Sequence, residues 1–235
     1  MKIAVTRLRG KDTDDSRRCA DLGHICYSVS PLKAEIHEDR IDRFIDEVNK
    51  GSYDCIFFTS ALPARLIAPR LSRWPRVIAI GPQTTGILTA RGIRCEVLPR
   101  FYSREFVPYL GDWIQGKQIG IPRADVPNPA LMEAIKDAGG TPDEIRCYSL
   151  VPTNERLDIS SADAVLFTSA FSFRSAIWDM RPELILMAIG EITAAEMRTG
   201  GIIPHVTGNG SLEGVLNALN HYIRNPEGSP ENRRP

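Results

Sequence analysis

The sequence lacks several features that would assign it to a common functional class. Its 235 residues carry 29 Lys and Arg against 29 Asp and Glu, so the formal net charge is zero. A general nucleic-acid-binding protein usually has a basic excess. No apolar run approaches the roughly 20 residues that span a bilayer, and the apolar run in MKIAVTRLRGKD is too short for a secretory signal. We therefore expect a soluble, cytoplasmic protein that binds neither nucleic acid nor a membrane.

Cysteine and histidine are also sparse. The five cysteines are scattered and form no C-x-x-C pair: Cys19, Cys26, Cys55, Cys95 and Cys147. The four histidines have no metal-ligand spacing. We expect reduced, mostly buried thiols and no metal site.

The common catalytic signatures are missing. AIGPQTTG lacks the lysine of a phosphate-binding loop, no G-x-G-x-x-G follows the first strand, and there is no G-x-S-x-G. The acidic cluster DTDD, with Asp12, Asp14 and Asp15, could supply paired catalytic carboxylates. It precedes a predicted helix, so we favour a capping role.

What the sequence does contain is an internal repeat, which we examine first. CIFFTSALPARL begins at Cys55 and AVLFTSAFSFRS begins at Ala164, 109 positions later. The offset of 109 persists in three further pairs, Gly81 with Gly190, Thr84 with Thr193, and Gly92 with Gly201. KIAVTR (2–7) also resembles KQIGIPR (117–123), and CYSVSP (26–31) resembles CYSLVP (147–152). We infer the duplication of one α/β unit.

The repeat also predicts the fold class. Residues 55–58 and 164–167 are short apolar runs that end in turn-forming residues, as buried parallel strands do. EDRIDRFIDEVNKG is an amphipathic helix, with one apolar face formed by Ile41, Phe44, Ile45 and Val48. Alternating strands and helices indicate an α/β fold with parallel sheets and helices on both faces. The polar tail 225–235 is expected to be disordered.

Hydroxyl side chains follow the predicted strands. Thr59–Ser60 and Thr168–Ser169 fall at the carboxyl ends of strands, where α/β proteins bind ligands. Ser60, Ser169, Gly81 and Gly190 are placed to cap helices, with Thr84 and Thr193 in the first turns. Helix N-termini attract anions, each by only about 0.3–1 kcal/mol at an exposed site, so a ligand with many carboxylates or phosphates fits best. The alternative is that these residues only cap helices, that Arg7 and Arg123 are ordinary ion-pair partners, and that Tyr27 and Tyr148 are half-buried strand residues.

Taken in order, these segments resemble the uroporphyrinogen-III synthase family. The matching segments are VTR (5–7), IFFTSA (56–61), AIGPQT (79–84), IPRAD (121–125), CYSLVP (147–152), VLFTSA (165–170) and AIGEIT (188–193). The resemblance covers residues 1 to about 223. It implies a HemD-like, flavodoxin-like fold of two α/β domains, 1–31 plus 153–235 and 32–152, joined by a two-stranded linker with an interdomain cleft. The residues alone would also permit one division near 115.

The resemblance implies an enzyme of porphyrin (heme, siroheme or cobalamin) biosynthesis. Such an enzyme is a cyclising hydro-lyase that converts hydroxymethylbilane, a linear tetrapyrrole with eight carboxylates, into uroporphyrinogen III with loss of water and inversion of ring D. It implies no cofactor and no metal, and we expect a monomer. Tyr148 would be the catalytic acid, and the substrate-binding residues would be Arg7, Thr59, Ser60, Thr84, Arg123, Thr168, Ser169 and Thr193.

Two points and two rival functions stay open. Ile192 stands where a second hydroxyl can occur in the family, and Phe171 and Phe173 could pack on pyrrole rings, although we favour a core role. The first rival is a non-catalytic module of the same fold that binds a tetrapyrrole or another polyanionic metabolite. The second is an enzyme acting on a sugar or nucleotide phosphate, which the missing phosphate loops disfavour.

Overall fold

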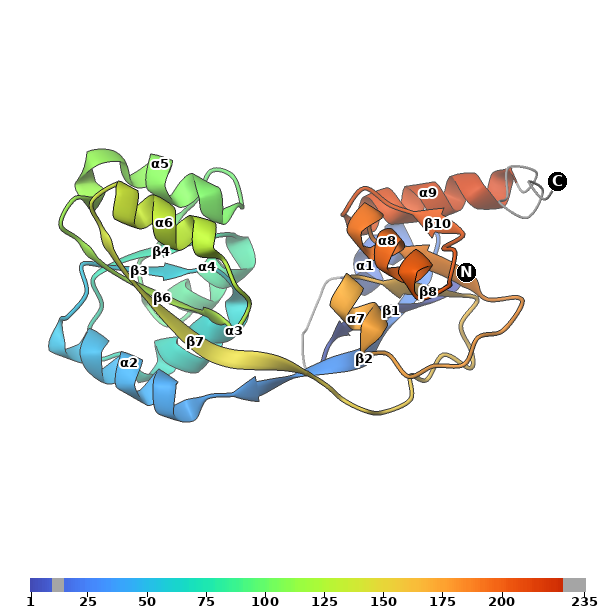
Figure 1. Ribbon diagram of the computed structural model, residues 1–235, viewed down its shortest axis with the longest axis horizontal. Coiled ribbons are helices and arrows are strands. Elements are labelled where there is room, and N and C mark those ends of the chain that lie inside the picture. The colour runs from blue at the N-terminus through green and yellow to red at the C-terminus, as the bar shows by residue number, and fades with distance from the viewer. Residues whose placement is uncertain (10–14, 226–235) are drawn as a thin grey trace. The chain divides into compact units, whose positions relative to one another are not determined.

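The computed structural model describes residues 1–9 and 15–225, and the chain forms two compact units (Figure 1). Unit 1 comprises Met1–Ala34 and Val151–Pro235, and unit 2 comprises Glu35–Leu150. The chain leaves unit 1 within strand β2 (Ile25–Ile36) and returns within strand β7 (Thr141–Pro152). The tail 225–235 was expected to be disordered, and its residues 226–235 lie outside the described residues.

Unit 1 contains a parallel sheet in the order β10-β9-β8-β1-β2. Its other strands are β1 (Lys2–Leu8), β8 (Ala164–Phe167), β9 (Ile185–Ala188) and β10 (Val206–Thr207). Counted along the chain, this is the 2-1-3-4-5 order of flavodoxin-like folds, read from the opposite edge.

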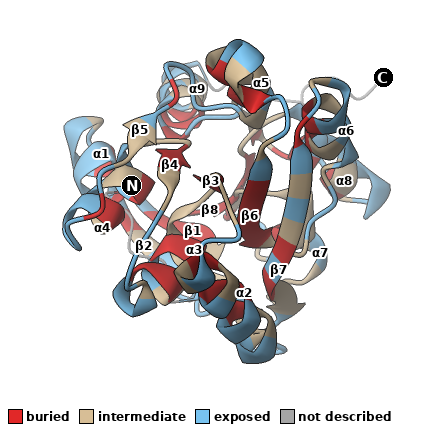
Figure 2. Ribbon diagram, turned by 90° about the vertical axis from the view of Figure 1, so that its left-hand side faces the viewer, coloured by how far each residue is buried: buried red, intermediate tan, exposed pale blue. Residues whose placement is uncertain are grey.

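Unit 2 repeats this sheet in the order β7-β6-β3-β4-β5, again with parallel pairs. Its other strands are β3 (Cys55–Phe58), β4 (Arg76–Ala79), β5 (Glu96–Val97) and β6 (Gln118–Ala124). Counting from β6 as the first strand gives the same 2-1-3-4-5 order. β6 is buried through most of its length (Figure 2). The predicted α/β class with parallel sheets is confirmed.

The helices follow the strands and cover the sheets. Their bounds are α1 Asp15–Asp21, α2 Glu38–Lys50, α3 Ala61–Ile67, α4 Pro82–Thr89, α5 Phe106–Leu110, α6 Pro129–Asp137, α7 Ala170–Arg174, α8 Glu191–Thr199 and α9 Leu212–Arg224. Single 3-10 turns cover Ala68–Arg70, Ser103–Glu105 and Gly111–Ile114. In unit 1, Ile3 and Val5 pack with residues of α9, while Ala4 packs with residues of α8 on the other face. Helices therefore lie on both faces of this sheet.

The sequence pattern of α2 determines its packing. Its four apolar residues spaced for one face are all buried, as predicted: Ile41, Phe44, Ile45 and Val48. The helix ends at Gly51, whose φ of 89° is in the left-handed region that a glycine adopts without strain.

The repeat offset of 109 is confirmed by the elements. β3 and β8 begin 109 residues apart, as do β4 and β9, and α4 and α8. Gly92 and Gly201, also separated by 109, both have positive φ after these helices.

The predicted match of CYSVSP with CYSLVP is wrong. Cys26 pairs with Ile3 near the start of β2, whereas Tyr148 pairs with Ala124 near the end of β7. Because Ala4 and Gly120 are equivalent in the first strands, the residue of β7 that corresponds to Tyr27 is Asp143. Four shared residues do not fix the register, which is set by pairing along the whole strand.

The expectation that all cysteines are reduced is wrong for one pair. Cys19 on α1 and Cys26 on β2 form a disulfide with a Cα–Cα distance of 5.9 Å. The tight turn between α1 and β2 brings these two buried side chains together, a proximity that a spacing of seven residues does not signal. Cys55, Cys95 and Cys147 are free thiols.

Candidate functional site

In both units the strand order reverses between the first and third strands, and ligands of such sheets bind at the carboxyl side of this switch point. In unit 1 the switch lies between β1 and β8, and in unit 2 between β6 and β3. Arg7 lies near the end of β1, and Thr168–Ser169 follow β8 directly. Arg123 lies near the end of β6, and Thr59–Ser60 follow β3. Each unit thus holds three of its predicted residues at its own switch point.

Tyr148 and Ser60 form the central pair in unit 2. Tyr148 is only 7% exposed, and the side chain of Ser60 lies near its hydroxyl. Burial raises the pKa of the Tyr148 phenol above its usual value of 10, and the neighbouring Ser60 side chain opposes this shift. Ser60 occupies the N-cap position of α3, but its side chain makes no capping bond. The phenol is therefore protonated at neutral pH and can donate a proton.

Arg123 lies close to Tyr148 and is buried. Its guanidinium donates to Glu144 Oε1 at 2.9 Å and to the Val126 carbonyl at 2.6 Å. Arg146 Nε also donates to Glu144, at 3.3 Å. These bonds fix Arg123 beneath the loop that follows β6.

A polar chain flanks Tyr148 through its neighbour Ser149. His37 Nε2 lies 2.9 Å from Ser149 Oγ, and this hydroxyl lies 3.5 Å from Asp125 Oδ2. Asp125 in turn pairs with Arg146 at 3.0 Å. Sequence reasoning missed this chain because His37 and Asp125 lie in separate connections far apart along the sequence.

In unit 1 the hydroxyls at the switch point bind the backbone. Thr168 Oγ1 donates to the Thr6 carbonyl at 2.6 Å, and the Thr168 N–H donates to Thr6 Oγ1 at 2.9 Å. Arg7 Nε donates to Asp15 Oδ2 at 2.6 Å. Sequence reasoning missed Thr6, although it lies within the VTR segment. Of the acidic cluster, Asp15 begins α1, while Asp12 and Asp14 lie outside the described residues.

Ser169 and Ser60 occupy repeat-related positions but differ in their bonds. Ser169 caps α7, since its Oγ accepts from the Ser172 N–H at 3.0 Å. The predicted cap is therefore present at Ser169, while the side chain of Ser60 makes no capping bond.

Thr84 and Thr193 lie in the first turns of α4 and α8, behind the N-caps Gly81 and Gly190. Both threonines are buried, whereas Thr59 is half-buried. Nearby in unit 1, Phe173 packs edge-on against Phe167 with ring centroids 5.1 Å apart, which agrees with a core role.

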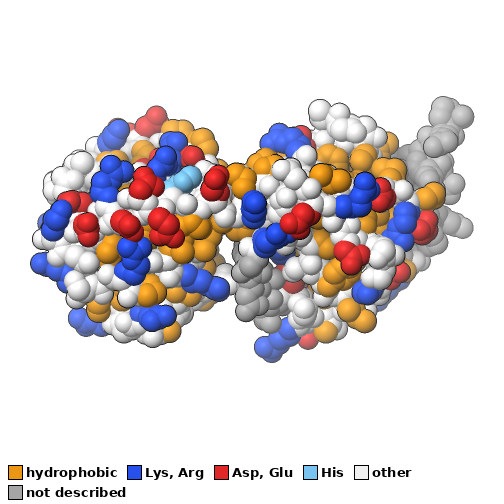
Figure 3. All heavy atoms as spheres, turned by 90° about the horizontal axis from the view of Figure 1, so that it is seen from below, with side chains coloured by type: hydrophobic (Ala, Val, Ile, Leu, Met, Phe, Trp, Pro, Cys, Tyr) orange, Lys and Arg blue, Asp and Glu red, His pale blue; other side chains and the backbone are white. Residues whose placement is uncertain are grey.

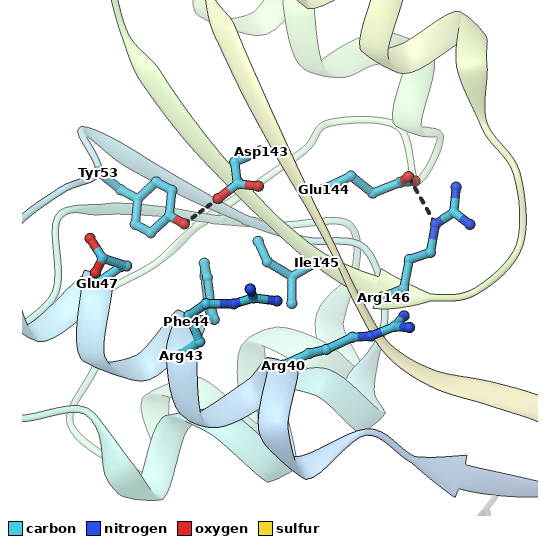
Figure 4. A pocket seen from close by; sticks show the side chains of 9 residues that line it. All are labelled: Arg40, Arg43, Phe44, Glu47, Tyr53, Asp143, Glu144, Ile145 and Arg146. Atoms are coloured by element: carbon cyan, nitrogen blue, oxygen red, sulfur yellow. Dashed lines mark hydrogen bonds and ion pairs between the residues drawn. The ribbon is translucent and has the colours of Figure 1, made fainter.

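A pocket of about 480 Å³ lies between α2 and β7 of unit 2 (Figure 4). It is lined by Arg40, Arg43, Phe44, Glu47, Tyr53, Asp143, Glu144, Ile145 and Arg146. Its acidic groups are engaged: Glu47 by Lys50 and Ser52, Asp143 by the Tyr53 hydroxyl, and Glu144 by two arginines. None of the predicted site residues lines this pocket.

Neither the surface charge seen in Figure 3 nor the arrangement of possible metal ligands among the described residues indicates a further binding site. Acidic and basic side chains are interspersed on the face of each unit seen in Figure 3. Within residues 1–9 and 15–225, no three His, Cys, Asp or Glu side chains are grouped to hold a metal ion. No helix in this part of the chain is long and apolar enough to cross a membrane.

Comparison with known proteins gives concordant matches. The family described as uroporphyrinogen-III synthase HemD matches residues 14–207. A protein of Archaeoglobus fulgidus, named provisionally as a uroporphyrinogen-III synthase, is 24% identical over 237 residues, 93% of this chain and 98% of that protein.

Two solved structures share the fold. Uroporphyrinogen-III synthetase from Helicobacter pylori has a TM-score of 0.62 at 14% identity, covering 95% of this chain and 100% of that chain. A mutant uroporphyrinogen III synthase from the extremely thermophilic bacterium Thermus thermophilus has a TM-score of 0.51 at 15% identity, covering 96% and 98%.

Proposed function

Because the chain belongs to the uroporphyrinogen-III synthase family, we propose that it cyclises hydroxymethylbilane to uroporphyrinogen III. Membership of the family supports a tetrapyrrole substrate and a role in porphyrin and heme biosynthesis. The proposal adds the reaction itself, which is loss of water from the linear tetrapyrrole and ring closure with inversion of ring D. It requires no cofactor or metal.

The first step is departure of the substrate hydroxyl. A proton donated to this hydroxyl lets it leave as water, while the lone pair of the adjacent pyrrole nitrogen supplies the electrons that break the carbon–oxygen bond. The resulting cation is attacked by ring D through a spiro intermediate, which rearranges and loses a proton to give the closed macrocycle. The protein has to supply a proton donor, hold the flexible chain in the productive conformation and disfavour closure without inversion.

The observation that carries the proposal is the buried phenol of Tyr148, with Ser60 beside it, at the switch point of unit 2. A phenol with a raised pKa keeps its proton at neutral pH. We assign Tyr148 the role of acid.

We further propose that the carboxyl edge of each sheet binds substrate carboxylates. In unit 2 the contributing residues are Thr59, Ser60, Thr84 and Arg123, and in unit 1 they are Arg7, Thr168, Ser169 and Thr193. Thr84 and Thr193 are buried, so their part is to hold the first helical turns whose backbone N–H groups meet the anion. Arg7 and Arg123 are ion-paired and supply positive charge at the end of a strand.

Incubation with hydroxymethylbilane, followed by oxidation and separation of the type I and type III uroporphyrin isomers, tests the proposal. We expect type III to exceed the amount formed without protein. Type I alone, at the uncatalysed rate, would contradict catalysis, and binding of uroporphyrin without turnover would favour the non-catalytic module. We also propose that the enzyme is a cytoplasmic monomer; light scattering after size-exclusion chromatography measures its mass.

A further inference from the structure

Two aromatic side chains are exposed in the connection between β5 and the 3-10 turn Ser103–Glu105. Phe101 and Tyr102 are each 57% exposed, whereas the other four phenylalanines of unit 2 are at most 2% exposed: Phe44, Phe57, Phe58 and Phe106. Leaving aromatic surface in water forgoes the favourable burial that drives folding. These two rings therefore do not serve the core of unit 2.

The two rings lie at the carboxyl edge of the sheet. Carbons of the Phe101 ring come within 3.8 Å of the point where Gly81, the N-cap of α4, would carry a Cβ. The connection is held in place, because the Tyr102 N–H donates to the Arg100 carbonyl at 2.9 Å and Asn128 Nδ2 donates to Ser103 Oγ at 3.2 Å. The aromatic pair thus stands on an anchored loop beside the first turn of α4.

The repeat shows that the fold does not require aromatic residues here. Gly210 of unit 1 lies 109 positions after Phe101, and its backbone nitrogen is 3.2 Å from the equivalent Cβ point on Gly190. Ser211, the counterpart of Tyr102, caps α9 by accepting from the Gly214 N–H at 3.0 Å. In unit 1, backbone atoms of Gly210 and the small polar residue Ser211 occupy the place beside the N-cap glycine. The exposed rings are therefore specific to unit 2.

Basic side chains flank the aromatic pair. The Arg104 guanidinium lies 4.6 Å from the centroid of the Tyr102 ring. The side chains of Arg100 and Arg104 are 74% and 75% exposed, and each is 3.8 Å from Glu105 Oε1, a long contact for an ion pair. The loop therefore presents flat apolar surface next to two accessible cations.

We propose that Phe101 and Tyr102 bind a pyrrole ring of the tetrapyrrole substrate by stacking, with Arg100 and Arg104 receiving the carboxylates of the same ring; this inference rests on the proposed function. A substituted pyrrole is a flat, electron-rich ring that carries negatively charged carboxylates at its edge. Aromatic faces and edges bind such a ring, and guanidinium groups bind its carboxylates. Phe101 and Tyr102 are thus residues that position the substrate without taking part in proton transfer.

The test compares the double variant Phe101→Leu/Tyr102→Leu with Trp74→Leu and the wild type. Leucine keeps apolar bulk and removes the ring. Trp74 is an exposed aromatic of unit 2, 39% exposed, that precedes β4 and so lies near the amino edge of the sheet. Two quantities are measured: KM and kcat with hydroxymethylbilane, and the Kd for uroporphyrin III by fluorescence titration. For the double variant we expect both KM and Kd to rise about two- to tenfold with kcat nearly unchanged, and for Trp74→Leu no change in either.

The outcomes separate the two proposals. If the wild type produces the type III isomer and the double variant keeps the wild-type KM and Kd, the stacking inference is overturned while the proposed function stands. If the wild type binds uroporphyrin III without turnover, the proposed function fails, and the Kd of the double variant still decides the inference. A wild type that neither binds nor turns over overturns both. A wild-type dimer that becomes monomeric in the double variant would show that the rings contact a second copy of the chain, and would also overturn the inference.

Discussion

At the scale of single residues, the tyrosines of the two units differ in what their hydroxyls contact. The Tyr148 hydroxyl lies near the Ser60 side chain at a switch point. Tyr27 donates to the Asp158 carbonyl at 3.2 Å, and Tyr53 donates to Asp143, which lines the same pocket (Figure 4). Of these three, only Tyr148 is buried. It is therefore the phenol to test as an acid.

Tyr148→Phe keeps the ring and removes the proton donor. Loss of a general acid commonly lowers the rate about 10²–10⁴-fold, so we expect kcat to fall toward that range while the far-UV circular dichroism stays unchanged. Tyr27→Phe is the control, since it removes one hydrogen bond to a backbone carbonyl in the other unit. Equal turnover of the two variants would rule out Tyr148 as the acid.

Ser60 and Ser169 offer a matched pair of substitutions. Ser169→Ala removes a helix cap, which costs about 0.5–2 kcal/mol of the free energy of unfolding. Ser60→Ala removes no cap, so we expect a smaller loss of stability. It should instead lower turnover, because the neighbouring hydroxyl that opposes the rise in the pKa of Tyr148 is lost and the phenol becomes a weaker acid. Urea midpoints and turnover of both variants are measured; the reverse pattern would contradict the assignment of the two hydroxyls.

At the scale of the elements, short sequence patterns predicted the features that depend on residues close together in the chain. The buried face of α2 follows from apolar spacing near 3.6 residues, and the Thr-Ser pairs mark where β3 and β8 end. What could not be predicted depends on partners distant in sequence. The bond of Arg123 with Glu144 and the register of Tyr148 arise only when β6 and β7 pair.

The disulfide between α1 and β2 could likewise not be predicted from the sequence. Its effect on the stability of unit 1 can be measured. Closing a loop of about eight residues removes unfolded-chain entropy worth about 2.5 kcal/mol. We expect the oxidised protein to need more urea to unfold unit 1 than the protein in dithiothreitol. Trp178 is the one tryptophan of unit 1, so its emission in a variant with Trp74→Phe and Trp113→Phe reports this unit.

Cys19→Ser/Cys26→Ser serves as the control, because its stability should no longer respond to reductant. A wild-type midpoint that is the same with and without dithiothreitol, together with two free thiols by mass spectrometry, would contradict the disulfide.

At the scale of the whole molecule, the two units share one strand order but differ in their buried titratable groups. Burial raises the pKa of Cys55 and of Cys147 from 9.0 to about 12, and both lie in unit 2. The two buried cysteines of unit 1 form the disulfide and do not titrate. The units should therefore respond differently to alkali.

Between pH 9 and 12 the unfolded thiols lose their protons while the folded thiols keep them. The unfolded state then binds fewer protons than the folded state, so the stability of unit 2 falls as pH rises, by about 1.4 kcal/mol per pH unit for each thiol. In Trp178→Phe the emission of Trp74 and Trp113 reports unit 2, and we expect its urea midpoint to drop between pH 9 and pH 10.5. Adding Cys55→Ala and Cys147→Ala should flatten this dependence; an unchanged slope would show that other groups cause it.

The nested order of the strands has a consequence for synthesis on the ribosome. β1 and β2 are translated first, but β1 is a central strand whose neighbour β8 begins 128 residues after the end of β2. At about 5–20 residues per second, this partner follows roughly 6–26 s later, and unit 2 is complete in the interval. Unit 2 begins after unit 1 but is completed before it. One edge of β1 therefore stays unpaired in the nascent chain until β8 is made, early in the last third of the message.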